Sequence, residues 1–333
     1  MTNHTISCYL KENFLTFGMA AVLLCEFMVG LLGNGVALWI LCFHMNPWKP
    51  SSVYLFSLSL ADFSLIFCMP IRAYYFLQGK DWHFGDIPCR LFLFMISLNR
   101  AGSIFFLTAV AVDRYFRVVH PHHKINMTTK KGAIGTACMI WCFIVIMMMH
   151  LLTKPHLTVS EADNKTLCES FSFNNDQSPM TTWHNAFFVI EFVVPLGIIM
   201  FCTWSIVRQL RHQRKDKQGK IQKAAKSVTF VAFVFIFCFL PSTVATLALV
   251  ISRSLNQCKS FEMAGVILLI SLSLTYFNSM LNPVVFYFSN PTFQTTINQF
   301  ISSKLLKSTK AAENEFPNNS SDSAHKTSNQ MRM

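Results

Sequence analysis

The chain has 333 residues, of which 52% are hydrophobic and only 13% are charged. Soluble domains carry about twice that charged fraction, so this composition excludes an ordinary soluble protein. The formal net charge of +12 would suit a nucleic-acid ligand, but the excess lysines and arginines lie in short segments between apolar runs. We therefore expect this charge to set membrane topology, with no nucleic-acid partner.

Seven apolar runs are long enough to cross a hydrocarbon core of about 30 Å as helices. They cover roughly 16–43, 52–78, 88–118, 132–152, 184–208, 225–251 and 263–288. We therefore expect an all-α membrane protein, a seven-transmembrane helix bundle within residues 16–290. Residues 291–306 are predicted to form a short amphipathic helix on the membrane surface. Residues 1–15 are polar, and the polar segment 307–333 is predicted to be a disordered cytoplasmic tail.

Positive charge predicts the orientation of the bundle. The segment between the fifth and sixth runs carries Arg208, Arg211, Arg214, Lys215, Lys217, Lys220, Lys223 and Lys226. Because cytoplasmic loops are rich in lysine and arginine, we expect the N-terminus outside the plasma membrane and the C-terminus in the cytoplasm. This orientation places glycosylation sequons at Asn3 and Asn164 on the outside.

Four of the 11 cysteines are predicted to lie outside, where disulfides persist: Cys8, Cys89, Cys168 and Cys258. Four cysteines allow three connectivities. One of these joins Cys89 to Cys168 and leaves Cys8 to pair with Cys258.

The third run contains two arginines that require an explanation. Arg100 lies about 16 Å beyond Cys89 along a helix, and Arg114 about 21 Å further. Arg100 therefore falls within the hydrocarbon, where a charged side chain usually marks a functional site. It either forms a structural ion pair with Glu191 or Glu26, or holds a ligand's carboxylate through two parallel N–H···O bonds.

Arg72 lies near the outer end of the second run, just past Pro70. It either adds a second positive group at the mouth of the pocket or snorkels to the membrane surface. Its place at a helix end slightly favours snorkelling.

Several polar side chains lie near the middle of the membrane. They are Asn34, Asp62, Asn99, Ser103, Asn278 and Asn282. The last four form two i, i+4 pairs, so each pair presents two oxygens on one helix face. One carboxylate ringed by such oxygens suits a small hard cation, whereas the alternative is a hydrogen-bond network that holds the helices together.

Prolines fall inside four of the runs, at Pro70, Pro195, Pro241 and Pro283. A proline lacks the N–H that a helix needs and kinks it. Kinked helices around a buried polar cluster suit a bistable switch.

Seven motifs, one on each run, resemble the rhodopsin-like (class A) G-protein-coupled receptors over residues 16–305. They are GNGVALW at 33–39, LSLADF at 58–63, Asp113-Arg114-Tyr115, Trp141, Pro195, the segment Cys238-Phe239-Leu240-Pro241, and Asn282-Pro283. The resemblance implies that Arg114 pairs with its neighbour Asp113 in the inactive state and meets a G protein in the active state. It also implies an allosteric sodium ion, the one cofactor expected, in a pocket of Asp62, Asn99, Ser103, Asn278 and Asn282.

The sequence is also similar to the hydroxycarboxylic acid receptor group and its oxoeicosanoid and 12-HETE receptor relatives. The shared stretches are WHFGDIPC at 82–89, NRAGSI at 99–104, DRYFRVVHPHH at 113–123, CESF at 168–171 and LTYFNSMLNP at 274–283. This resemblance implies that Arg100 anchors the ligand carboxylate and that Ser170, its neighbour Phe171 and Tyr276 lie at the ligand. It further implies a Cys8–Cys258 disulfide and coupling to inhibitory G proteins, which lowers cyclic AMP.

Four positions depart from these patterns. Thr246 replaces an arginine that several members of the group carry, so one anionic contact is missing. Asn282 replaces the aspartate of the group's usual Asp-Pro, Phe286 replaces a tyrosine, and Phe239 replaces the wider family's tryptophan. The first affects which ligand binds, and the others affect basal activity.

The leading hypothesis is a receptor for a small or lipid-derived hydroxy or oxo monocarboxylic acid. One alternative is a receptor for a long-chain oxidised fatty acid, and another, from a different class, is a transporter or channel. We do not expect an enzyme, because the histidines are scattered along the chain. Arrestin, receptor kinases and membrane lipids are further partners that the receptor hypothesis implies.

Overall fold

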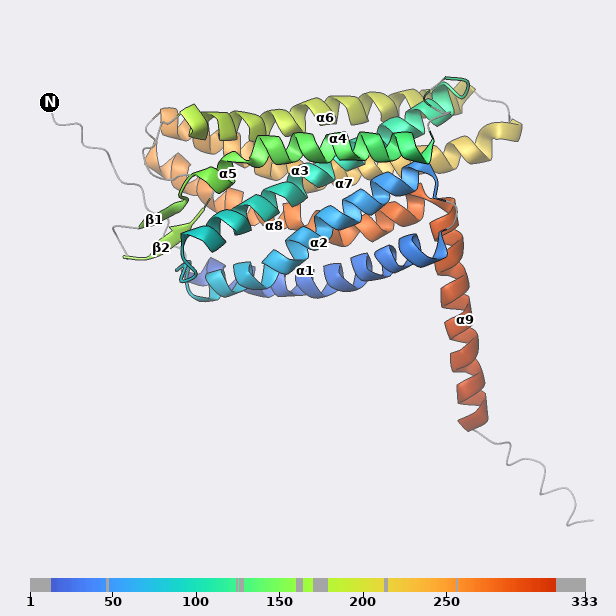
Figure 1. Ribbon diagram of the computed structural model, residues 1–333, viewed down its shortest axis with the longest axis horizontal. Helices are drawn as coiled ribbons and strands as arrows, with labels where there is room; N and C mark the ends of the chain where they lie inside the picture. Colours follow the sequence, from blue (N-terminus) through green and yellow to red (C-terminus); the bar gives the residue numbers. More distant parts are fainter. Residues whose placement is uncertain are drawn as a thin grey trace, which may run out of the picture.

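The computed structural model describes residues 13–45, 48–123, 125, 129–159, 164–169, 179–212, 215–255 and 257–315. Its elements are α1 (Asn13–Trp39), a π-helical turn η1 (Ile40–His44), α2 (Pro50–Leu77), α3 (Asp86–Val119), α4 (Lys130–Met148), α5 (His150–Thr153), β1 (Leu157–Val159), β2 (Thr166–Cys168), α6 (Pro179–His212), α7 (Lys215–Ser254), α8 (Cys258–Ser289) and α9 (Pro291–Glu315). The long helices lie side by side in one bundle, with the β1–β2 hairpin at one end and α9 projecting sideways from the other (Figure 1). We call these the hairpin end and the α9 end.

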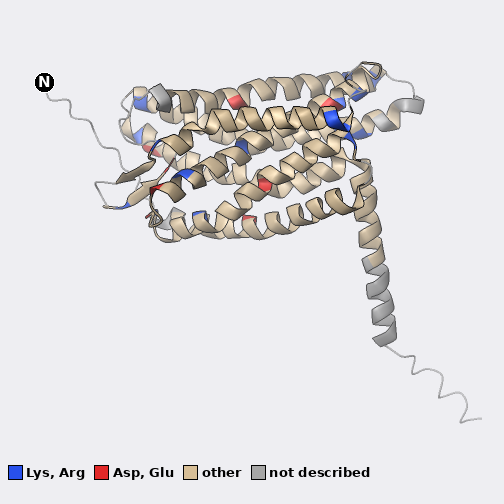
Figure 2. Ribbon diagram, in the orientation of Figure 1, with Lys and Arg blue, Asp and Glu red and all other residues tan. Residues whose placement is uncertain are grey.

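The predicted seven-transmembrane bundle is confirmed. Within the described residues, seven helices are long and apolar enough to cross a membrane. They cover Thr16–His44, Pro50–Leu77, Asp86–Val119, Lys130–Thr153, Thr182–His212, Ile221–Ser254 and Cys258–Ser289. Most of the lysines and arginines lie near the two ends of the bundle, and few charged residues lie along its middle (Figure 2). This distribution matches a layer of hydrocarbon between two aqueous faces.

Local sequence explains where several helices begin. Pro50 occupies the first turn of α2, where a missing N–H costs nothing. The side chain of Thr129 accepts a hydrogen bond from the backbone N–H of Gly132, at 3.3 Å, and so caps α4. The four predicted prolines do lie inside α2, α6, α7 and α8.

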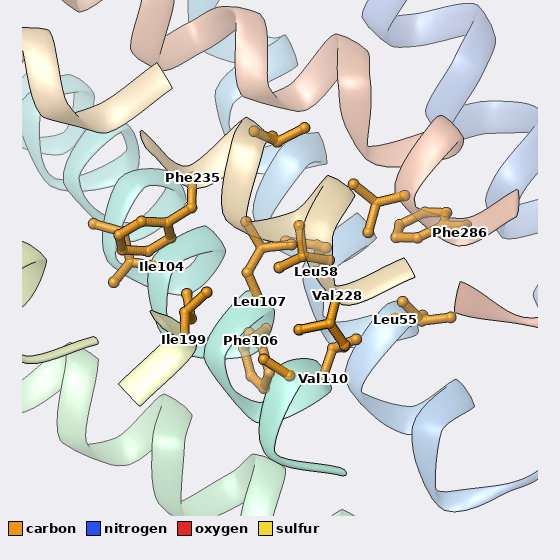
Figure 3. Close-up of a cluster of buried hydrophobic side chains, with 14 of the residues drawn as sticks. Leu55, Leu58, Ile104, Phe106, Leu107, Val110, Ile199, Val228, Phe235 and Phe286 are labelled. Carbon is orange, nitrogen blue, oxygen red and sulfur yellow. The ribbon is translucent and has the colours of Figure 1, made fainter. Parts of the chain in front are cut away.

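The largest buried cluster lies between α2, α3, α6, α7 and α8. Figure 3 shows Leu58 of α2 next to Leu107 of α3, with Phe235 and Phe286 at the two sides. Lipid tails are as apolar as these side chains, so close packing rather than exclusion of water holds the helices together. Gly102 illustrates the closeness, because a Cβ atom added there would lie 2.9 Å from the Cβ of Ala61.

A two-stranded antiparallel hairpin forms the hairpin end and was not predicted from the sequence. Leu157 faces Cys168 in its register, and Cys168 forms a disulfide with Cys89 at the start of α3. The N–H of Thr166 donates to Asp81 at 3.0 Å, while its carbonyl accepts from the N–H of Trp82 at 2.8 Å. The hairpin is therefore attached both to α3 and to the loop after α2.

The predicted second disulfide and the two predicted glycosylation sites lie partly outside the described residues. Cys258 is disulfide-bonded, but its expected partner Cys8 lies outside them, as does the sequon at Asn3. Asn164, the other sequon, is exposed. The surface helix α9 runs to Glu315, further than the predicted end at residue 306.

Candidate functional site

Arg100 lies at the centre of the candidate site, buried on α3 with 4% of its surface exposed. Its Nε donates to Oε1 of Glu191 on α6 at 2.6 Å, and the two side chains are 5% and 1% exposed. Its Nη1 donates to the hydroxyl of Ser242 at 3.0 Å. Its Nη2 donates to the hydroxyl of Thr243 at 3.3 Å and to the carbonyl of Phe188 at 3.4 Å. One guanidinium thus joins α3 to α6 and α7.

An aromatic ring covers one face of the same guanidinium. Cζ of Arg100 lies 3.5 Å from the centroid of the Phe188 ring and 5.7 Å from that of Phe239. A cation over an aromatic face gains electrostatic stabilisation that grows as water is excluded. Phe239, which replaces the family's tryptophan, therefore takes part in the site.

Beside Arg100 is a cavity of about 50 Å³. Its lining comes from α3, α4, α6 and α8: Leu93, Ile96, Ser97, Arg100, Met148, His184, Phe187, Phe188, Glu191, Leu272, Thr275 and Tyr276. Six of these twelve residues are apolar and the other six carry polar groups. Apolar walls with convergent polar groups are a feature of small-molecule sites.

Hydrogen bonds continue from Arg100 to the proline kink of α7. Ser242 and Thr243 follow Pro241 directly, and both hydroxyls donate to the carbonyl of Phe239, at 3.0 and 2.9 Å. Thr275 on α8 donates to the hydroxyl of Ser242 at 3.2 Å. The cavity is therefore connected to the segment of α7 around Pro241 and, through Thr275, to α8, which sequence reasoning could not show because the hydroxyls lie on other helices.

The structure settles which carboxylate pairs with Arg100. The partner is Glu191, so the ion pair considered as the alternative to a free carboxylate clamp is present. Glu26, the other candidate, is buried on α1 with Oε2 lacking a hydrogen-bond partner among the described residues. Arg100 thus has both a native counter-ion and a cavity beside it.

Arg72 does not snorkel, contrary to the slight preference from the sequence. Only 6% of its surface is exposed, and its Cζ lies 5.5, 5.0 and 5.7 Å from the ring centroids of Tyr75, Phe76 and Phe92. Three rings packed around the side chain keep it from extending toward the surface. Among the described residues, none forms an ion pair with this guanidinium.

The remaining predicted ligand residues divide into two groups. Tyr276 lines the cavity and is 4% exposed. Ser170 and Phe171 lie outside the described residues, so their expected role stays a prediction. Thr246, at the position where the resemblance implied an arginine in several members of the group, is buried and donates to the carbonyl of Ser242 at 2.9 Å.

Two of the residues predicted for the sodium pocket, Asn99 and Asn282, contact the carboxylate of Asp62. This carboxylate accepts hydrogen bonds from Ser279 at 2.7 Å, from Asn282 at 2.8 and 3.0 Å, and from Asn99 at 3.3 Å. Ser279, which sequence reasoning missed, is thus the shortest contact. It adjoins Asn278, so the polar face of α8 is wider than the i, i+4 pair predicted.

Other oxygens of the residues predicted for the pocket are buried without a hydrogen-bond partner in the part of the chain described. They include Ser103 Oγ, Asn278 Oδ1 and Asn282 Oδ1. Oxygen atoms and a carboxylate are the ligands that small hard cations prefer. The chemistry of these donors therefore fits a sodium ion, although the described hydrogen bonds bring only Asn99, Ser279 and Asn282 to the Asp62 carboxylate and already satisfy it.

The Asp113-Arg114-Tyr115 segment is not arranged as the resemblance implied. Asp113 pairs with Arg117 one turn further along α3, with Nε to Oδ2 at 2.8 Å. Arg114 instead donates to the backbone carbonyl of Ser289 at the end of α8. A cation near the last carbonyls of a helix is favoured by the helix dipole. The expected Asp113–Arg114 pair is therefore replaced by a direct link between α3 and α8.

Comparison with known proteins identifies the family. A family model described as 7 transmembrane receptor (rhodopsin family) matches residues 33–286. The chain belongs to the rhodopsin family of seven-transmembrane receptors. This receptor is 45% identical over 305 residues to Hydroxycarboxylic acid receptor 3 of Homo sapiens, covering 90% of this chain and 77% of the relative.

Two further relatives place the receptor more closely. It is 45% identical over 293 residues to Hydroxycarboxylic acid receptor 1 of Homo sapiens, covering 88% of this chain and 82% of the relative. It is 37% identical over 290 residues to Oxoeicosanoid receptor 1 of Homo sapiens, covering 87% and 73%. The receptor is therefore a multi-pass protein of the plasma membrane, in a family of receptors rather than of enzymes.

Proposed function

We propose that this receptor binds a small hydroxy or oxo monocarboxylic acid in the cavity beside Arg100 and signals through inhibitory G proteins to lower cyclic AMP. The observation that supports the proposal is the set of acceptors that the Arg100 guanidinium binds. Its Nη1 and Nη2 bind neutral acceptors, two hydroxyls and a carbonyl, next to a cavity. A ligand carboxylate that takes over this edge replaces these neutral acceptors with an ionised one, so that donor and acceptor both carry a charge and two parallel N–H···O bonds can form.

A bound carboxylate would give the site an excess negative charge, which a second cation nearby would offset. Glu191 already neutralises Arg100, so an incoming carboxylate adds one uncompensated negative charge. Arg72 is buried and has no ion-pair partner among the described residues. We propose that it is the cation that favours an anion at this depth, without itself lining the cavity.

The same exchange gives the ligand a way to act on the helices. If the carboxylate takes Nη1 and Nη2, Ser242 and Thr243 lose their contact with Arg100. These residues follow Pro241, where α7 lacks one backbone hydrogen bond. We propose that this release alters the bend of α7. The hydrogen bond between Arg114 and Ser289 would then transmit the change to the α9 end of the bundle, where we expect the G protein to bind.

Similarity and cavity size together favour a small acid over a long one. The hydroxycarboxylic acid receptors are 45% identical to this chain, against 37% for Oxoeicosanoid receptor 1. A cavity of about 50 Å³ holds a few non-hydrogen atoms. A long oxidised acyl chain would require the surrounding helices to separate.

We further propose that Asp62, Asn99, Ser103, Asn278 and Asn282 hold a sodium ion. The support is the chemistry of the donor set, one carboxylate with unpartnered buried oxygens. When bound, the ion would supply a positive charge that neutralises Asp62. Ser279 would remain available to orient that carboxylate.

The test of the ligand site is a cyclic AMP inhibition assay with a panel of monocarboxylic acids. Arg100→Ala and Arg100→Lys should both lose the acid response when cells with surface expression matched to the wild type are compared, since lysine keeps the charge but not the planar fork. Arg90→Ala is the matched control, because Arg90 lies on the same helix and pairs with Asp86 at the hairpin end. A full acid response from Arg100→Ala would refute the site. Substrate flux in proteoliposomes without a G protein would instead support the transporter alternative.

A further inference from the structure

Two histidines on different helices face each other at the wall of the cavity. His150 lies on α5 and His184 near the start of α6, both toward the hairpin end of the bundle (Figure 1). Nε2 of His150 lies 3.0 Å from Nδ1 of His184, and the ring centroids are 5.1 Å apart. His184 also lines the cavity beside Arg100. The pair therefore links two helices at a point next to the proposed acid site.

A backbone hydrogen bond determines which nitrogen of His150 carries a lone pair. Its Nδ1 lies 2.9 Å from the carbonyl oxygen of Met147. A carbonyl oxygen only accepts, so Nδ1 carries the hydrogen and Nε2 carries the lone pair. Metal-binding histidines have this arrangement, because donation of the other ring N–H to a carbonyl holds the ring in position. Nε2 of His150 is therefore an oriented nitrogen ligand that points to a second imidazole.

The spacing of the two nitrogens suits one zinc ion. Two imidazole nitrogens that each lie about 2.0–2.1 Å from a tetrahedral zinc are roughly 3.3 Å apart. The observed distance of 3.0 Å is about 0.3 Å shorter, so a small rotation of either ring makes room for the ion. In the structure Nδ1 of His184 donates its hydrogen to His150. Moving that hydrogen to Nε2 of His184 exposes the second lone pair without loss of a proton, and two waters of the hydrated ion are exchanged for the two nitrogens.

The charges around the pair permit a divalent cation. Arg100, which shares the cavity lining with His184, is paired with Glu191, and Arg90 of the hairpin end is paired with Asp86. Among the described residues, no group of three or more His, Cys, Asp or Glu side chains is arranged to hold a metal ion. Water would therefore occupy the remaining coordination positions. A site with two protein ligands binds its ion reversibly, as suits a modulator rather than a structural metal.

We propose that His150 and His184 form a zinc site that links α5 to α6 and couples zinc to the acid response. Imidazole nitrogen suits zinc, whereas Mg²⁺ and Ca²⁺ prefer oxygen ligands. Binding of zinc is independent of the proposed function, but the coupling to the acid response rests on it. A divalent cation beside the cavity offsets the excess negative charge that a bound carboxylate gives the site. Zinc and the acid should therefore each strengthen the binding of the other.

The first experiment tests binding through thermal unfolding of the purified full-length receptor, followed by tryptophan fluorescence. Zinc chloride at about a hundredfold above its Kd should raise the Tm of the wild type by roughly 4 °C, and magnesium chloride should not. His150→Gln and His184→Gln should each remove the zinc effect, because the glutamine amide supplies no imidazole nitrogen. An unchanged Tm of the wild type in zinc, or an undiminished shift in either variant, would overturn the proposal. If one variant does not fold, the other decides the question.

His156→Gln is the matched control. His156 follows α5 toward the hairpin, and no hydrogen bond joins it to His150 or His184 in the part of the chain that the structure describes. This variant should keep the full zinc effect on Tm. Loss of the effect in His156→Gln would assign the zinc to a different set of histidines and so overturn the proposal.

The second experiment tests the coupling through inhibition of cyclic AMP by an active monocarboxylic acid, with and without zinc chloride. In the wild type, zinc should lower the half-maximal acid concentration about fivefold. His150→Gln, which does not alter the cavity lining, should show equal acid potency with and without zinc. Equal potency in the wild type would overturn the coupling. No response to any acid would refute the proposed function, whereas the zinc site itself stands or falls on the thermal unfolding result.

Discussion

The buried pair of Arg100 and Glu191 leads to a quantitative prediction about stability. The Nε–Oε1 distance is 2.6 Å, with both side chains almost fully buried. At an effective dielectric constant of about 20, two unit charges at this distance attract by about 6 kcal/mol. Desolvation of both ions offsets much of this attraction, so the pair contributes little net stability. Removing either side chain nevertheless leaves the other as an unpaired buried charge.

The perturbation is a double-mutant cycle with Arg100→Leu, Glu191→Leu and the two combined. Each single variant should lower the free energy of unfolding by about 3–5 kcal/mol, because an unpaired charge remains buried. The combined variant should be within about 1–2 kcal/mol of the wild type, since leucines fill the space without a charge. Because Arg100 also binds Ser242 and Thr243, Arg100→Leu should cost slightly more than Glu191→Leu.

The assay is thermal unfolding of the purified receptor with a thiol-reactive dye, which reports exposure of the buried free cysteines Cys68, Cys202 and Cys238. The single variants should lower Tm by roughly 10 °C and the combined variant by much less. Additive losses in the combined variant would refute the reasoning, since they would show that the two side chains contribute independently.

Three further predictions concern the rest of the molecule. The wild type should have a higher Tm in sodium than in choline at equal ionic strength, and Asp62→Asn should remove the difference; a persisting difference would locate the cation elsewhere. Breaking the Cys89–Cys168 disulfide, which spans 79 residues, with Cys168→Ser should cost about 4.5 kcal/mol of stability, measured by chemical unfolding; a cost near zero would contradict the chain-entropy estimate. Burial, with smaller contributions from His150 and Arg90, lowers the pKa of His156 from its ordinary value of 6.5. The unfolded chain therefore binds the proton more readily, and stability present above pH 6.5 is lost as pH falls below it. His156→Gln should flatten this loss in Tm measured against pH, and an unchanged slope would assign it to another group.

The candidate site shows what a sequence reveals about a buried charge. Arg100 could be identified because a guanidinium deep in a hydrophobic run is rare whatever surrounds it. Its partner could not be chosen, since Glu191 and Glu26 occur at similar depth and only the rotation of each helix decides which one faces α3. Ser242, Thr243 and Ser279 were missed for the same reason, because hydroxyl residues on apolar helices give no signal of their partners.

The sequence by itself determined the seven spans and the family, because the thickness of the hydrocarbon requires long apolar runs and the motifs lie within single helices. The tertiary structure decided every contact between helices. It placed Arg72 among three rings instead of at the surface, and paired Asp113 with Arg117 rather than Arg114. It also formed the hairpin, whose three-residue strands are too short to recognise until Cys89 and Cys168 are brought together. The physical reason is that hydropathy acts along one helix, whereas a side chain's partner depends on how several helices rotate and pack against one another.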